Sequence, residues 1–161
     1  MPMDELCFLW IFFCFLLSFW QGLPMAALFT LTADYFLLFT ENYAAGLFFF
    51  LLVQITYLQN LRIQPFPIGT IFIFPLALLF PLPLLGICYA LLFFLHINLA
   101  MKKVQPSCSK KLYLFGLFLF LCCDLTVAWG YFHTPNPRLI WLFYAPSQLL
   151  LTVTARVIPI R

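Results

Sequence analysis

Apolar residues occur along this chain in long, continuous runs that lack the alternation of a half-buried β-strand. The runs are rich in Leu and Phe, which favours membrane-crossing helices over a β-barrel. Proline, glycine and short polar turns separate the runs. The pattern therefore predicts an all-α, polytopic transmembrane helix bundle of about seven membrane-spanning helices. These spans are expected at 6–21, 24–40, 43–60, 67–82, 84–101, 112–132 and 138–156.

The proline-rich segment 75–86 fits either a turn between the fourth and fifth spans or one kinked helix. The distribution of basic residues favours the turn. With seven spans, every lysine and arginine except Arg138 falls on one side of the membrane. Merging the two spans would put Arg62 opposite the lysine-containing segment 102–111. With seven spans, the positive-inside rule predicts an outside N-terminus and a cytoplasmic C-terminus.

Composition agrees with a membrane protein. Hydrophobic residues make up 65% of the chain and charged residues 8%, whereas a soluble domain carries about 25% charged residues. We interpret residues 1–161 as a single integral membrane domain. The acidic start argues against a cleavable signal peptide, and the short chain without an organelle signal favours a multi-pass protein of a bacterial plasma membrane. The lysines of 102–111 are expected in a solvated loop near anionic lipid, so no nucleic-acid partner is predicted.

Two carboxylates, Asp34 and Asp124, interrupt the apolar runs. An Asp at the middle of a membrane helix costs about 2.5–3.5 kcal/mol on insertion scales, so such residues usually face the bundle interior or a water-filled cavity. At 1.5 Å per residue, Asp34 lies about 9 Å and Asp124 about 12 Å inside the outer end of its span. We therefore expect both in one layer of the outer half. A packing hydrogen bond between helices is the simpler alternative for each.

A glutamine follows each carboxylate on the returning helix: Gln54 after Asp34, and Gln148 after Asp124. Tyr57 shares a helical face with Gln54, and Tyr144 lies one turn before Gln148. These side chains would line a polar interior, or simply join helices by hydrogen bonds. The helix pairs 24–60 and 112–156 have the same orientation and are compatible with a parallel repeat that holds a site between its halves.

The histidines and cysteines predict no metal site. His96 and His133 are not accompanied by the three or four clustered ligands that zinc requires. We interpret His96 as a polar residue near the inner end of the fifth span. Most of the cysteines lie inside apolar runs, where cysteine behaves as a small hydrophobe.

Two groups of residues carry a family resemblance. The first group is Ala33, Asp34, Leu37, Gly46, Phe50, Gln54 and Tyr57. The second group is Gly116, Phe120, Cys123, Asp124, Ala128, Tyr144, Gln148 and Leu150. In this order and spacing they resemble the YhhN family of membrane proteins, which includes the lysoplasmalogenases. The resemblance covers residues 30–60 and 112–155. The chain departs from the family in its shorter length, in Cys123 where serine is common, and in Pro146 within the last helix.

The resemblance implies hydrolysis of the vinyl-ether bond of a lysoplasmalogen to a fatty aldehyde and a glycerophospho-head group. Protonation of the vinyl carbon needs an acid that keeps its proton near neutral pH, and burial beside a second carboxylate favours that form. One of Asp34 and Asp124 would be the acid and the other its ionised partner; the resemblance does not say which residue has which role. Gln54, Tyr57, Tyr144 and Gln148 would hold water or the polar oxygens of the substrate. No metal or organic cofactor is implied, and the lysophospholipid would come from the bilayer.

Two other functions fit the same residues. A small proton-coupled carrier would use the aspartates as a protonation site and the repeats as gating halves. A non-catalytic membrane protein would use them only as packing bonds.

Overall fold

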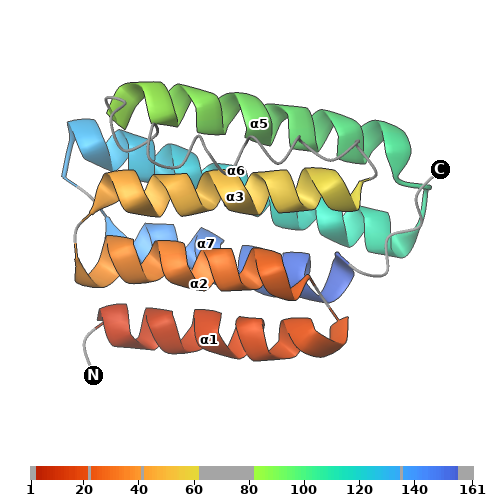
Figure 1. Ribbon diagram of the computed structural model, residues 1–161, viewed down its shortest axis with the longest axis horizontal. Helices are drawn as coiled ribbons and strands as arrows, with labels where there is room; N and C mark the ends of the chain where they lie inside the picture. The colour runs from red at the N-terminus through yellow and green to blue at the C-terminus, as the bar shows by residue number, and fades with distance from the viewer. Residues whose placement is uncertain (1–2, 22, 41, 62–81, 135, 156–161) are drawn as a thin grey trace.

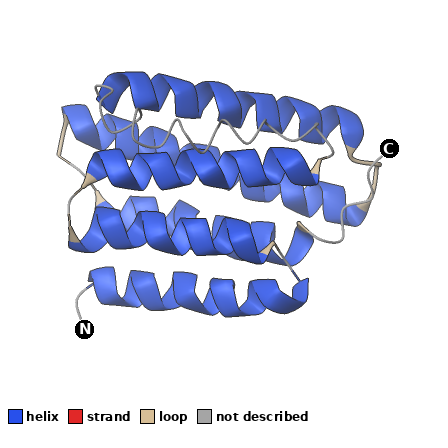
Figure 2. Ribbon diagram, viewed as in Figure 1, coloured by secondary structure: helices blue, strands red, loops and turns tan. Residues whose placement is uncertain are grey.

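The computed structural model describes residues 3–21, 23–40, 42–61, 82–134 and 136–155. Six helices and no strand occur in these ranges (Figure 2). The all-α prediction is thereby confirmed. The helices are α1 (Met3–Gln21), α2 (Pro24–Phe39), α3 (Tyr43–Asn60), α5 (Leu82–Lys103), α6 (Cys108–Phe132) and α7 (Pro137–Thr154). The span predicted at 67–82 lies almost wholly outside the described residues.

Polar side chains and prolines define where the helices begin. The Asn42 carboxamide accepts a hydrogen bond from the Ala45 N–H at 3.1 Å and caps α3. Ser107 caps α6 in the same way, and Asn136 caps α7. Proline occupies the first turn of α2 and of α7, where its missing N–H costs nothing. These turn signals explain why the predicted and observed boundaries agree closely.

Lys110 closes the turn between α5 and α6. Its ammonium donates to the carbonyl oxygens of Met101 at 2.6 Å and Val104 at 2.7 Å. A cation at a helix C-terminus satisfies carbonyls that have no partner within the helix. This lysine of the predicted solvated loop therefore has a structural role.

The six helices form a ring in which α1 contacts α2, α2 contacts α3, α3 contacts α5, and α6 contacts α7. Helices α1 and α7 also contact each other. The contact between α5 and α6 is the loosest in the ring. The pairs α2–α3 and α6–α7 are antiparallel, whereas α3 and α5 run in the same direction (Figure 1). Helices α2–α3 and α6–α7 are also the most closely packed neighbours.

Three of the described helical segments are long and apolar enough to cross a membrane: Tyr43–Asn60, Leu82–Lys103 and Cys108–Gly130. Helix α2 is also apolar but shorter. Large apolar side chains point outward from the bundle, among them Phe132, Trp20 and Leu91. Such a surface is unfavourable in water and suited to lipid, so the structure supports a membrane protein.

Aromatic rings and glycines fill the interior. The Phe120 ring lies about 6 Å, centroid to centroid, from Phe50, Phe93 and Tyr144. Gly46 allows the close approach of α3 to α2, because a Cβ atom there would lie 2.5 Å from Cγ of Leu37. Gly116 does the same for α6, against Leu150 of α7.

Replacement of Gly46 by Ala should therefore lower the stability of the bundle. We expect a loss of about 1–3 kcal/mol, because overpacking forces neighbouring groups to move. The control is Gly86→Ala, where a new Cβ would meet nothing within 4 Å. Thermal unfolding of the detergent-solubilised protein measures both changes. Equal losses in the two variants would contradict close packing at Gly46.

Candidate functional site

Asp34 lies inside the bundle on α2 and is 5% exposed. The hydroxyl of Tyr144, on α7, donates to its Oδ2 atom at 2.6 Å. This bond joins a helix of the predicted pair 24–60 to a helix of the predicted pair 112–156. Two of the residues predicted from sequence are thus brought into direct contact.

Asp124 has a matching arrangement on α6. The hydroxyl of Tyr89, on α5, donates to its Oδ2 atom at 2.8 Å. Asp124 itself is partly buried, whereas Tyr89 is buried. Each carboxylate is therefore held by a tyrosine hydroxyl from another helix, as expected for an acid that cannot be solvated by water.

Cys123 links the two pairs. Its buried thiol is close enough to interact electrostatically with both Asp34 and Asp124. The Tyr144 and Tyr89 hydroxyls are also within electrostatic range of each other. The two aspartate–tyrosine pairs consequently lie in one region of the interior, and their shared neighbour is a cysteine.

Gln54 and Tyr57 belong to a second polar cluster, around His96 of α5. His96 is fully buried, with Nδ1 2.8 Å from Oε1 of Gln54 and Nε2 2.6 Å from the Tyr113 hydroxyl. The Tyr57 ring stacks on the imidazole at 5.2 Å. The interpretation of His96 as a polar residue at a helix end is wrong, because both ring nitrogens are bonded inside the core.

Sequence reasoning also missed Tyr89 and Tyr113. A signal for the first was present: Tyr89, Phe93, His96 and Ala100 follow one another at spacings of four, three and four, and all are buried. That spacing marks the inward face of α5. Tyr113 carries a similar signal, because Tyr113, Leu117 and Phe120 follow one another at spacings of four and three and all are buried.

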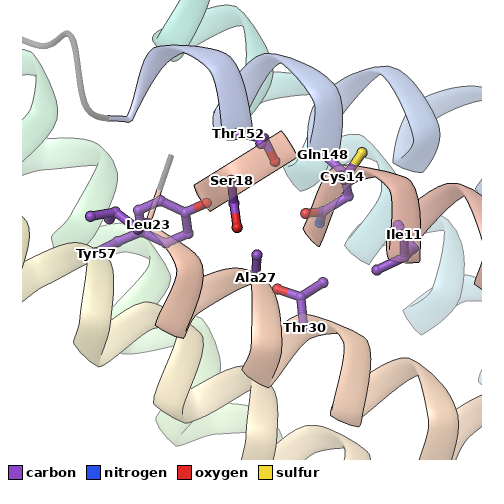
Figure 3. Close-up of a pocket in the computed structure, with 9 residues that line it drawn as sticks. All are labelled: Ile11, Cys14, Ser18, Leu23, Ala27, Thr30, Tyr57, Gln148 and Thr152. Atoms are coloured by element: carbon purple, nitrogen blue, oxygen red, sulfur yellow. The ribbon is translucent and has the colours of Figure 1, made fainter. Parts of the chain in front are cut away.

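Gln148 lines a small cavity together with Tyr57 of the His96 cluster (Figure 3). The cavity volume is about 10 Å³, enough for the centre of about one water molecule. Side chains of Cys14, Ser18, Thr30 and Thr152 supply further polar lining. A polar cavity of this size is suited to an internal water.

A larger, open cavity of about 320 Å³ lies at the junction of α1 and α7. Its lining is apolar: Leu6, Cys7, Trp10, Trp141 and Ala145. Trp141 packs edge-on against Tyr144, and Cys7 is within electrostatic range of Asp34. Neither cavity is lined by Asp34 or Asp124. The cavity between α1 and α7 nevertheless lies next to the Asp34–Tyr144 pair.

In the described part of the chain, no three histidine, cysteine or carboxylate side chains are close enough to hold a metal ion. Comparisons with protein-family models, with curated proteins and with solved structures found no match for this chain. The arrangement of the site therefore carries the functional argument.

The Tyr144–Asp34 bond should be measurable by a double-mutant cycle. Tyr144→Phe should destabilise the wild-type protein but have little effect when Asp34 is already Leu. We expect a coupling energy of about 1–3 kcal/mol, because Tyr144→Phe takes a hydrogen-bond donor from a buried carboxylate only in the protein that retains Asp34. Unfolding in detergent gives the four free energies.

The exposed Tyr35 of α2 provides a matched control for that cycle. Tyr35→Phe removes the same hydroxyl from a lipid-facing position and should leave stability unchanged in both backgrounds. A coupling energy near zero for Tyr144 would show that its hydroxyl does not stabilise Asp34.

Proposed function

We propose that this chain is a membrane-embedded hydrolase, related to the YhhN family, that cleaves the vinyl-ether bond of a lysoplasmalogen. The observation that carries the proposal is the pair of carboxylates inside an apolar bundle. Asp34 and Asp124 are each bonded by one tyrosine hydroxyl and share the thiol of Cys123 as a neighbour. General acid catalysis with a partner carboxylate requires two such groups in different protonation states.

The reaction needs only proton transfers and one water. The acid transfers its proton to the vinyl carbon remote from the ether oxygen, which leaves an oxocarbenium ion. Water adds to the carbon that bears the oxygen, and the ionised carboxylate accepts a proton from that water. The hemiacetal then breaks its bond to the glycerol oxygen, which takes its proton from the second carboxyl group and returns that group to the ionised form. The hemiacetal hydroxyl returns a proton to the first carboxylate, and the fatty aldehyde leaves.

The junction of α1 and α7 offers an approach for the lipid. Its apolar cavity opens to the outside of the bundle beside the Asp34–Tyr144 pair. A single hydrocarbon tail is compatible with that lining, and the ether oxygen would then face the tyrosine. Gln54, Tyr57 and Gln148 do not line this apolar cavity, and Gln148 with Tyr57 borders the water-sized one. In this scheme these three residues support water or the site's geometry rather than contact the tail.

The proposal includes the topology predicted from the sequence: seven spans, an outside N-terminus and a cytoplasmic C-terminus, in a bacterial plasma membrane. The parallel directions of α3 and α5 are consistent with a further crossing between them. With this topology, both aspartates lie in the outer half, and the His96 cluster lies in the cytoplasmic half.

An aldehyde-release assay tests the hydrolase. Purified protein in detergent or liposomes should release fatty aldehyde from a lysoplasmalogen. Asp34→Asn and Asp124→Asn should each lower the rate at least about tenfold, because each removes one proton-transfer group. The control is Asp4→Asn, which makes the same change on an exposed residue of α1. Inert wild-type protein that is nevertheless folded would rule out this activity.

A proton-coupled carrier is the second candidate, and the His96 cluster favours it. Polar side chains continue from Asp124 through Tyr89 and Gln54 toward the inner end of the bundle. A carrier would acidify the lumen of liposomes when a substrate gradient is applied, and Asp124→Asn would abolish the response. Aldehyde release without proton movement would exclude the carrier.

A further inference from the structure

Five polar side chains connect end to end through the interior, from α6 to α5 and α3 and back. They are Tyr113, His96, Gln54, Tyr89 and Asp124, and we call them the polar chain. Hydrogen bonds of 2.6 Å, 2.8 Å and 2.8 Å join Tyr113 to His96, His96 to Gln54, and Tyr89 to Asp124. The Gln54 side chain also interacts with the Tyr89 hydroxyl and completes the connection.

The chemistry of each group fixes the direction of these bonds. Oε1 of Gln54 can only accept, so the Nδ1 atom of His96 must carry the hydrogen. The Nε2 atom of the neutral imidazole is then an acceptor, and the Tyr113 hydroxyl donates to it. With Oε1 of Gln54 bonded to His96, the amide N–H is the group of Gln54 that can donate to the Tyr89 oxygen. The Tyr89 hydroxyl donates its own hydrogen to the carboxylate. Every hydrogen therefore points toward Asp124.

Asp34 has a different environment. Its bond comes from Tyr144, and the rings of Phe120 and Trp141 pack against that tyrosine. Hydrogen bonds in series polarise one another, so the last donor of a long chain is stronger than a single hydroxyl. The two carboxylates are consequently unequal, although each accepts one tyrosine hydroxyl.

We propose that the polar chain is polarised toward Asp124 and keeps this carboxylate ionised, which leaves Asp34 as the proton donor. The second half of this assignment rests on the proposed hydrolase. His96 and Gln54 are positioning residues, because they act on Asp124 through Tyr89. Among the described residues, the Tyr89 hydroxyl and the Cys123 thiol are the ionisable groups that interact with Asp124. A neutral thiol and a neutral hydroxyl do not compensate a second negative charge, so the two carboxylates are not ionised together.

The polar chain has a second, reversed state that makes the proposal measurable. If Asp124 were protonated and donated its hydrogen to Tyr89, each later bond would turn around. Gln54 would then present its N–H to His96, and the imidazole would carry its hydrogen on Nε2 and donate to Tyr113. The tautomer of His96 therefore reports the direction of the hydrogen bonds that lead to Asp124, three side chains away.

Nitrogen NMR of ¹⁵N-histidine-labelled protein at neutral pH reads this tautomer. The chain has two histidines, and His133 lies at the exposed end of α6. In the His133→Gln variant, His96 is the only labelled residue. The expected spectrum is that of a neutral imidazole with its hydrogen on Nδ1. A hydrogen on Nε2, or a doubly protonated ring, would overturn the proposal.

Two matched variants test whether Asp124 sets the tautomer. Tyr89→Phe cuts the polar chain next to Asp124, and it should allow a mixture of both tautomers at His96. Tyr144→Phe removes the corresponding hydroxyl from Asp34, and it should leave the wild-type spectrum unchanged. The same response in both variants would overturn the proposal.

Infrared spectroscopy tests the assignment of the acid. At neutral pH the protein should show the C=O stretch of a protonated, buried carboxylic acid. The band should disappear in Asp34→Asn and remain in Asp124→Asn; the opposite result would overturn the assignment. Neither spectroscopic experiment requires turnover. Failure of the aldehyde assay alone would therefore remove the hydrolase and leave the polarised chain in place.

Discussion

The hydrogen bond from Tyr144 to Asp34 joins residues that are 110 positions apart in the chain. Among apolar helices a carboxylate cannot recover the hydration it loses, so another helix has to supply a donor. That requirement fixes the rotation of α2 and α7 about their axes. The same need for a donor applies to Asp124, and Tyr89 of α5 supplies that donor. Helices α5 and α6 pack less closely there, and these polar side chains bridge the two helices. The polar groups thus determine how the apolar helices face one another.

The helices were predictable from sequence because their signals are local. Apolar runs give the spans, and Asn42, Ser107 and Asn136 show where three helices begin. The inward direction of Asp34 followed from the cost of exposing a carboxylate to lipid. Contacts between distant helices have no such local signal. The partnership of Asp34 with Tyr144 depends on the ring order of the helices, which hydropathy does not encode.

His96 shows most clearly which contacts could not be predicted from the sequence. Its place seven residues before the end of α5 favoured a polar residue near the membrane surface. In the structure it is fully buried because Gln54 and Tyr113 satisfy both ring nitrogens. Those partners come from two other helices, far from His96 in the case of Gln54 and across the α5–α6 turn in the case of Tyr113. A buried polar residue can be recognised from sequence only when its partner is known, and here the partners are distant.

The contact between α1 and α7 has a consequence for biosynthesis. The Trp10 indole donates to the backbone carbonyl of Ala145 at 3.0 Å, so the earliest described helix is held by the last one. During translation α1 enters the membrane long before this acceptor exists. The ring can therefore close only after α7 has been released by the ribosome and inserted. Until then the face of α1 that carries Trp10 remains open to lipid or to insertion factors.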